Sequence, residues 1–480
     1  MKKKENFGHQ VASGLFWKFG ERIIAQGVSF IISLILARLL LPEQYGTISL
    51  VLVFINIANV FVSDGLGESL VQKNDSDELD FSTIFFCSLI IGCFLYILLF
   101  IMAPFIAAFY NNTALVPVIR VLSIQIPLSA IKTIQHAYVQ KHMMFKKFFF
   151  STLGGTVVSG VIGIIMAYKG FGVWALVEQY LTNSVMDLTI LFITVKWRPR
   201  FLFSTESAKR LLSFGWKLLA AQFINVLYNE LRSLVIGKNY SEADLAYYNR
   251  GAHFPSLIIT NINTSISTVL FPAMSKVNGN IDDVRKLTRK SMKMTSYVIF
   301  PMMVGMCAVA EPLIRLLLTE KWLPCVVFMQ LCCVYWMFQP CQTANVQAIK
   351  SVGRSDICLK LEIIKKLIGF LIVLISMRIS VFAIVASNML FAAISTAINI
   401  IPNKRLIHYG FMNQLVDLLP AALLSVVMGG VVYCISFIGL SDIVTLFIQV
   451  ICGLAIYVAG SIIFQFEAFI DIKKLVFKER

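Results

Sequence analysis

Residues 81–103 read FSTIFFCSLIIGCFLYILLFIMA, an apolar run of 23 residues without one charged side chain. As an α-helix the run is about 34 Å long, because each residue adds about 1.5 Å along the axis. The hydrocarbon core of a bilayer is about 30 Å thick. The run therefore predicts a helix that crosses a membrane.

Similar apolar stretches occur on both sides of this run, over nearly the whole chain. Several contain or border proline, which bends a membrane helix more often than it ends one. No period-2 alternation of apolar and polar residues is found, so strands are not expected. The fourteen expected spans are 12–40, 44–63, 80–103, 114–138, 147–168, 172–195, 211–237, 244–274, 292–312, 323–347, 359–377, 380–401, 414–437 and 442–466.

The composition supports the same class of fold. The chain has 480 residues, of which 58% are hydrophobic and 14% charged, with a mean hydropathy of +0.78. Soluble domains carry roughly 25% charged residues, and one or two soluble cores cannot bury this much apolar surface. The sequence therefore predicts an all-α polytopic membrane protein with about 14 transmembrane helices. No small-residue cleavage site follows the first apolar run promptly, so we expect an uncleaved first span. The expected loops are all short and leave no room for a soluble catalytic domain.

The net charge of +16 is explained by topology. With the N-terminus in the cytoplasm, cytoplasmic segments hold 29 of the 42 Lys and Arg residues, outer loops hold 5, and 8 lie inside spans. Cytoplasmic loops of membrane proteins carry such an excess of cations. The distribution predicts cytoplasmic N- and C-termini. Because topology explains the positive charge, we do not expect the protein to bind nucleic acid.

A weak internal repeat divides the chain. Phe19-Gly20 opens the first expected span and Phe214-Gly215 opens the seventh, and residues 41–45 align loosely with residues 240–244. This predicts two parallel six-helix lobes, 1–205 and 206–405, followed by two additional helices and a cytoplasmic tail in 406–480. Substrate sites of such repeat proteins usually lie between the halves.

Polar side chains follow one face of the first two spans of each half. Residues three and four apart share a helix face, and hydrocarbon would penalise these faces. We therefore expect them to line a hydrophilic cavity between the halves. The alternative is that they pair with one another across buried helix contacts. Cations there would hold an anion, and Arg suits bidentate contact with phosphate. The candidate cavity residues are Lys18, Arg22, Gln26, Asn56, Asn59, Lys217, Asn225, Asn229, Arg232, Tyr247, Tyr248, Asn249 and Arg250.

Acidic and aromatic residues of the expected spans allow more than one interpretation. Glu21 and Glu230 are candidates for local ion pairs or for ion coupling. Tyr247 and Tyr248 either stack on sugar rings or anchor the helix at the membrane interface. Glu178 and Asp187 are nine residues apart on one span and face opposite ways, so we do not expect them to form one site.

Motifs for other chemistries are absent or weak. The chain has no P-loop and no H-E-x-x-H, and its ten cysteines contain no C-x-x-C, so we expect no cofactor, metal or catalytic residue. Asp75-Ser76-Asp77 has the D-x-D form of glycosyltransferases, but an acidic loop produces such a triplet by chance.

Several longer motifs resemble the polysaccharide transporter family, the Wzx-type O-antigen and exopolysaccharide flippases of the MOP superfamily. The likeness is greatest to the colanic-acid and teichuronic-acid exporter branch. The motifs that carry it are Phe19-Gly20-Glu21-Arg22, residues 36–46 (LARLLLPEQYG), Asp64-Gly65-Leu66-Gly67, residues 170–177 (GFGVWALV), residues 247–250 (YYNR) leading to Leu270-Phe271-Pro272, residues 353–356 (GRSD) and residues 361–366 (LEIIKK).

The resemblance implies a MATE-like fold of two six-helix lobes with two C-terminal helices that can cradle a lipid tail. It implies a bacterial cytoplasmic-membrane flippase that translocates undecaprenyl-pyrophosphate-linked oligosaccharide by alternating access, for lipopolysaccharide or exopolysaccharide synthesis. Polysaccharide polymerase and chain-length machinery are the partners it suggests, besides membrane lipid. Its charged cavity positions correspond to Arg22, Arg232 and Arg250, whereas the second span offers no cation here.

Two other functions stay open at this point. A membrane glycosyltransferase or polymerase acting on the same lipid would need a large external loop or an external acidic motif. A multidrug or cation antiporter of the same fold would need an anionic cavity, whereas the expected cavity is cationic.

Overall fold

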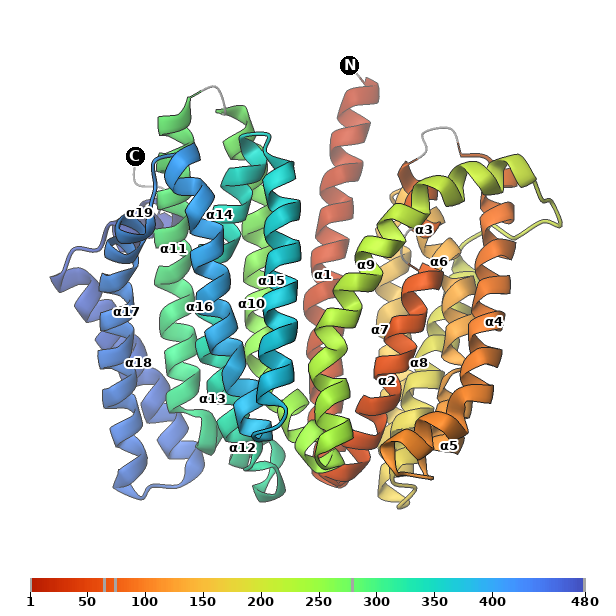
Figure 1. The fold of residues 1–480 in the computed structure, drawn as a ribbon, viewed down its shortest axis with the longest axis horizontal. Coiled ribbons are helices and arrows are strands. Elements are labelled where there is room, and N and C mark those ends of the chain that lie inside the picture. Colours follow the sequence, from red (N-terminus) through yellow and green to blue (C-terminus); the bar gives the residue numbers. More distant parts are fainter. Residues whose placement is uncertain (1, 64–65, 73–75, 278–279, 478–480) are drawn as a thin grey trace. The chain divides into compact units, whose positions relative to one another are not determined.

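The chain is built from helices and short connections. The computed structural model describes residues 2–63, 66–72, 76–277 and 280–477, and no strand occurs in these ranges. The helices form two compact units, residues 1–246 and 247–480 (Figure 1). Each unit is described by itself below.

The first unit holds nine helices in its described residues. They are α1 (Lys2–Leu39), α2 (Pro42–Ser63), α3 (Leu66–Gln72), α4 (Glu78–Tyr110), α5 (Leu115–Leu122), α6 (Gln125–Lys141), α7 (Phe145–Tyr168), α8 (Val173–Thr194) and α9 (Thr205–Asn239).

The second unit begins inside the next helix. Its helices are α10 (Glu242–Lys276), α11 (Ile281–Ala308), α12 (Ala310–Leu318), η1 (Glu320–Trp322), α13 (Cys325–Trp336), α14 (Gln339–Ser351), α15 (Ser355–Ser376), α16 (Val381–Leu406), α17 (Phe411–Cys434), η2 (Ile435–Ile438), α18 (Asp442–Ile463) and α19 (Glu467–Phe477).

All fourteen expected spans coincide with one helix or with consecutive helices. The spans 114–138, 292–312 and 323–347 each contain a break, and α11 and α12 meet at a bend of 68°. In the described residues, eight helices are long and apolar enough to cross a membrane, or up to ten if each bent pair is one span. The helical, multi-span membrane class is thus confirmed, and the number fourteen stays a prediction.

Local sequence explains where several helices begin. Asp77 precedes α4, and its side chain accepts a hydrogen bond from the Asp80 backbone N–H at 2.9 Å. Ser204 and Ser380 cap α9 and α16 in the same way. Such caps satisfy amide groups that have no partner inside the helix. Gly353 has a φ of +80° between α14 and α15, a conformation that glycine adopts without steric cost.

The first connection of each expected half is equally short. Two residues join α1 to α2, and two residues join α9 to α10. In the first, the Leu41 N–H donates to Gln44 Oε1 at 3.0 Å, and in the second the Ser241 N–H donates to Asp244 Oδ2 at 3.2 Å. The two turns are alike, but the bonded residues are one position out of step with the alignment above, so the internal repeat stays a prediction.

The compact division falls later than the predicted boundary at 205/206. Helix α9 packs against α2, α3 and α4 and so belongs to the first unit. The start of α10 is held there too, because the Glu242 carboxylate accepts hydrogen bonds from Thr47 and Asn112. The predicted three-part division stays a prediction, while packing places the unit boundary within α10.

Small residues allow α7 and α8 to approach closely. A Cβ on Gly155 would lie 3.2 Å from the Asn183 carbonyl oxygen and 3.3 Å from the Asp187 amide nitrogen. Glycine at such positions lets membrane helices pack backbone to backbone. This contact fixes where the side chains of α8 point within the first unit.

Candidate functional site

A polar cleft lies between α2 and α9 in the first unit. Two of the four expected polar faces meet there, and the cavity measures about 270 Å³. The amide of Asn56 donates from Nδ2 to Glu230 Oε1 at 3.0 Å. The lining residues are Asn56, Asn59, Val60, Ser63, Val226, Asn229 and Glu230.

The cleft offers both hydrogen-bond donors and hydrogen-bond acceptors. Asn56, Asn59 and Ser63 are spaced by three and four residues, so one face of α2 presents them all. The Ser63 hydroxyl donates to the Asn59 carbonyl oxygen at 2.6 Å. Asn59 Oδ1 is buried without a hydrogen-bond partner among the described residues, and it can accept from a hydroxyl group. Asn225 lies exposed one turn before Asn229.

Arg232 lies one turn beyond this cleft on α9. Its side chain is 7% exposed, and its guanidinium carbon lies 5.8 Å from the centre of the Tyr228 ring. A cation over an aromatic face gains electrostatic stabilisation. The structure therefore provides a buried positive charge next to neutral hydrogen-bonding groups on the same helix.

Arg250 occupies a different environment in the second unit. Its guanidinium carbon lies 5.4 Å from the centre of the Trp322 ring, and Tyr247 meets the same ring edge-on at 6.0 Å. Trp322 is fully buried. Tyr248 and Asn249 are partly exposed on α10. Tyr247 thus packs on a protein ring in this structure, which is a further interpretation beside sugar stacking and interfacial anchoring.

The other predicted residues are on the helices where they were expected. Gln26 is exposed on α1. Lys18, Glu21 and Arg22 also belong to α1 and Lys217 belongs to α9, and their side chains lie outside the described part. Glu230, a candidate for an ion pair, accepts its hydrogen bond from Asn56.

The acidic triplet 75–77 has a structural explanation. Asp77 and Asp80 form a reciprocal capping box at the start of α4, and Asp77 N–H donates to Asp80 Oδ2 at 3.3 Å. Asp75 lies outside the described residues. Asp77 therefore acts as a helix cap, as expected for a triplet that arose by chance.

A buried cluster of ionisable groups was missed from the sequence. Asp187 on α8 lies 3.2 Å from Lys132 Nζ and 3.8 Å from His136 Nε2, both on α6. Ser151 on α7 donates a hydrogen bond to the same carboxylate. The sequence analysis compared Asp187 with Glu178 on its own helix, but its partners come from two other helices. The one available signal was Lys132 and His136, four residues apart on one face.

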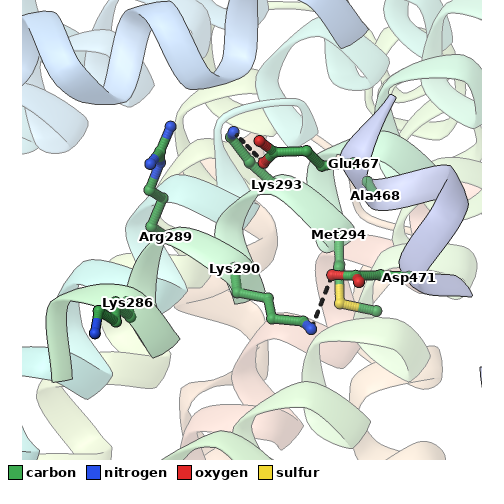
Figure 2. Close-up of a pocket in the computed structure, with 8 residues that line it drawn as sticks. All are labelled: Lys286, Arg289, Lys290, Lys293, Met294, Glu467, Ala468 and Asp471. Carbon is green, nitrogen blue, oxygen red and sulfur yellow. Dashed lines mark hydrogen bonds and ion pairs between the residues drawn. The ribbon is translucent and has the colours of Figure 1, made fainter. Parts of the chain in front are cut away.

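A second charged cavity, of about 200 Å³, lies between α11 and α19 in the second unit (Figure 2). Lys293 Nζ lies 2.7 Å from Glu467 Oε2, and Lys290 Nζ lies 2.8 Å from Asp471 Oδ2. The hydrogen bond from Lys293 lowers the pKa of the Glu467 carboxyl, and the nearby positive charges act in the same direction. These pairs hold α19, which the sequence analysis treated as tail, against the bundle.

Comparison with known proteins adds family evidence. Residues 35–327 match the family described as "Polysaccharide biosynthesis protein". The succinoglycan biosynthesis transport protein ExoT of Rhizobium meliloti (strain 1021) is 23% identical over 65% of this chain and 63% of its own length. The teichuronic acid biosynthesis protein TuaB of Bacillus subtilis (strain 168) is 26% identical over 62% of each chain. The lipopolysaccharide biosynthesis protein WzxC of Escherichia coli (strain K12) is 25% identical over 74% of this chain and 72% of its own.

Solved structures give the fold. The lipid II flippase MurJ in an inward closed conformation matches 94% of this chain and 98% of its own, with a TM-score of 0.75 and 14% identity. An inward-facing multidrug resistance MATE family transporter of the MOP superfamily matches 79% of this chain and 95% of its own, with a TM-score of 0.62 and 16% identity. The matched parts of ExoT and TuaB are less than two thirds of those proteins.

Proposed function

Because this chain belongs to the family of polysaccharide biosynthesis proteins, we propose that it is a flippase for lipid-linked oligosaccharide. The substrate is an undecaprenyl-pyrophosphate-linked glycan that moves from the cytoplasmic to the outer leaflet by alternating access. The protein acts as a transporter without a catalytic step, in the cytoplasmic membrane of a bacterium, with both termini in the cytoplasm. Polysaccharide polymerase and chain-length machinery are its proposed partners.

The polar cleft between α2 and α9 is the observation that carries this proposal. Its amides, hydroxyl and carboxylate can exchange hydrogen bonds with sugar hydroxyl groups, which both donate and accept. No residue there needs to form or break a bond in the substrate. The hydroxyl groups of a glycan in this cleft would take the place of water as hydrogen-bond partners of these side chains. Remaining waters could bridge the gaps, so sugars of different shape could bind.

We propose that the arginines of the candidate cavity bind the pyrophosphate end of the substrate, while the polar cleft binds its sugar end. Arg232 is buried one turn from Asn229 on α9. A guanidinium binds phosphate oxygens in a bidentate way, and a low-dielectric site strengthens that attraction. We assign the pyrophosphate to Arg22 and Arg232, and we keep Arg250 as a further candidate beside its Trp322 contact.

The names of the relatives and the fold support the same proposal. ExoT is named for succinoglycan biosynthesis transport, TuaB for teichuronic acid biosynthesis and WzxC for lipopolysaccharide biosynthesis, and MurJ is named as a lipid II flippase. A multidrug or cation antiporter is the alternative that the MATE likeness suggests. An antiporter for cationic drugs would gain nothing from Arg232, because like charges repel.

Reconstitution tests the proposal directly. The full chain is placed in liposomes with a defined undecaprenyl-pyrophosphate-linked sugar, and a membrane-impermeant lectin or oxidant reports the leaflet in which the sugar lies. We expect the wild type to equilibrate the sugar between leaflets faster than empty liposomes do. A change in the sugar chain itself would instead support a glycosyltransferase or polymerase.

Two variants on α9 make the test specific for the cleft. Asn229→Leu removes a polar lining residue and should slow translocation at least tenfold. Asn239→Leu is the matched control, because the Asn239 amide bonds to the Val235 carbonyl oxygen of its own helix. Equal rates for both variants and the wild type would contradict the assignment of the cleft.

A further inference from the structure

The buried cluster around Asp187 joins three helices of the first unit. Lys132 and His136 on α6 both face Asp187 Oδ2, and Ser151 on α7 donates to Oδ1. The exposed fraction is 8% for the Asp187 side chain, 27% for Lys132 and 28% for His136. An ionised carboxylate at such depth is costly unless it is paired, and ionisable groups inside membrane helices are usually functional.

The cluster lies close to one end of the bundle. Asp187 is seven residues before the end of α8, His136 is five before the end of α6, and Ser151 is six after the start of α7. At about 1.5 Å per residue, all three lie roughly 10 Å or less from the helix ends. A proton from water at that end would cross a short distance to reach the carboxylate.

The surroundings of Asp187 hold few other charges. Helix α6 supplies Lys132 and His136, α7 supplies the neutral Ser151, and the His136 ring packs on Phe148 with ring centres 4.5 Å apart. In the described residues, α2, α4 and α5 contribute no ion pair to this carboxylate. Among the described residues, Lys132 and His136 are therefore the ionisable side chains that lie against this carboxylate.

We propose that Asp187, Lys132 and His136 form a proton-binding site that couples transport by this chain to a proton gradient. The ligand is a proton and not a sodium ion, because the Lys132 ammonium already occupies the cation position beside the carboxylate at 3.2 Å. A hard metal cation needs several oxygen ligands. The hydrogen bonds and ion pairs of the described residues bring the oxygens of Asp187 and Ser151 to this cluster, and no group of three or more His, Cys, Asp or Glu side chains there could hold a metal ion. This inference rests on the proposed transport function.

The exchange involves one proton and no other change of bonds. In the observed arrangement, Lys132 and the Asp187 carboxylate form a pair with no net charge. A proton that binds Asp187 Oδ2 neutralises the carboxylate, so the pair loses its attraction and Lys132 keeps an uncompensated charge. His136 Nε2 lies 3.8 Å from the same oxygen, beyond hydrogen-bond distance, and a small movement lets it pass the proton on. Release of the proton restores the link between α6 and α8.

A pH jump tests proton binding without any glycan. The full chain is reconstituted in liposomes on a solid-supported membrane, and the charge displacement that follows the jump is recorded. The wild type should give a transient displacement, and Asp187→Asn should reduce it at least tenfold. Glu178→Gln is the matched control, since Glu178 lies on the same helix and its carboxylate bonds to Thr182. A wild-type signal from Asp187→Asn would overturn the proposal.

A double variant distinguishes a proton site from a purely structural ion pair. Lys132→Gln with Asp187→Asn removes both charges of the pair, so neither partner is left uncompensated and the double variant should fold even if the single variant does not. We expect a folded protein without the charge displacement. A folded double variant that translocates lipid-linked sugar at the wild-type rate under a proton gradient would overturn the proposal. If the wild type shows the displacement but moves no lipid-linked sugar, the proposed flippase function fails while the proton site stands.

Discussion

Arg232 shows how a single buried residue can contribute to the proposed binding of the substrate pyrophosphate. The residue is 7% exposed, and its guanidinium carbon lies over the Tyr228 ring, one turn from the polar cleft. Burying an arginine costs free energy that the protein must offset by contacts. A substrate phosphate would add charge-assisted hydrogen bonds, which are about twice as strong as neutral ones.

The first prediction concerns the cations of the first and ninth helices. Arg22→Ala or Arg232→Ala should abolish surface polysaccharide while leaving the protein in the membrane, because both are proposed to bind the substrate phosphate and loss of a buried charge contact costs about 2–5 kcal/mol or more. Immunoblots of membranes and staining of cell-surface polymer measure the two outcomes. Arg120→Ala is the control, since its exposed guanidinium packs on Phe100 at 4.4 Å. Normal surface polymer in both Arg22 and Arg232 variants would rule out the cation assignment.

The second prediction concerns Asp77. Because Asp77 caps α4 and asparagine is an equally good cap, Asp77→Asn should leave surface polymer and protein stability unchanged, as should Asp75→Asn. Asp77→Ala should lower the stability of the purified protein by about 1 kcal/mol, the usual loss for a removed cap. Thermal unfolding in detergent measures this. Complete loss of polymer at normal expression in either Asn variant would instead favour a glycosyltransferase.

At the scale of elements, close backbone contacts hold particular helices together. Gly46 on α2 and Glu242 at the start of α10 are one such contact, because a Cβ on Gly46 would lie 2.0 Å from the Glu242 carbonyl oxygen. The Glu242 side chain also binds Thr47 and Asn112. The start of α10 is thereby fixed to the ends of α2 and α4.

The third prediction follows from this contact. Gly46→Ala should destabilise the protein by about 1–3 kcal/mol, the range for overpacked sites, since the opposing backbone cannot turn aside as a side chain can. The midpoint of thermal unfolding measures the loss. Gly430→Ala on α17 meets nothing within 4 Å and should be neutral or slightly stabilising. Equal midpoints for both variants would show that α2 and α10 do not approach this closely.

The fourth prediction concerns the attachment of α19. The Glu467 pKa is lowered by Lys293, so the ionised carboxylate stabilises the folded state above its ordinary pKa, and this contribution is lost as the pH falls through the lowered value. Because the Glu467 side chain is 75% exposed, the effect should be below about 1 kcal/mol. Glu467→Gln should increase hydrogen exchange in residues 467–477 at pH 7.

A control variant separates the effect of this ion pair from the general effect of removing a surface carboxylate. Glu320→Gln removes an exposed carboxylate from another ion pair, with Arg315, and should leave exchange in α19 unchanged. Unchanged exchange in Glu467→Gln would mean that α19 is held without the Lys293–Glu467 pair, by the Lys290–Asp471 pair and its apolar contacts.

At the scale of the whole molecule, the distribution of charge sets orientation. The 29 cytoplasmic cations against 5 outer ones predict that Arg354 lies in the cytoplasm and Lys169 outside. Both residues lie in connections between helices. The fifth prediction is that a fluorescent protein inserted after Arg354 becomes fluorescent. Alkaline phosphatase should be active when it is inserted after Lys169 and inactive when it is inserted after Arg354. The reverse result would invert the proposed direction of transport.

Part of the site could be read from helical periodicity alone. Spacings of three and four residues predicted the polar face of α2 and that of α9, and the structure shows that they meet at Asn56 and Glu230. The Asp187 cluster could not be found that way, because its members lie on α6, α7 and α8 and are up to 55 residues apart in sequence. Nor could the packing of Tyr247 and Arg250 on Trp322 be predicted, since that contact depends on how η1 folds back.

The sequence by itself determined the class of this protein, the position of its helices and its family. Long uncharged runs can only be buried in lipid as helices, because every backbone group must find its partner inside the segment. Tertiary structure alone decided where α9 belongs, how α19 is held and which charges are paired. Those outcomes depend on contacts between side chains that are distant in sequence, and no local period encodes them.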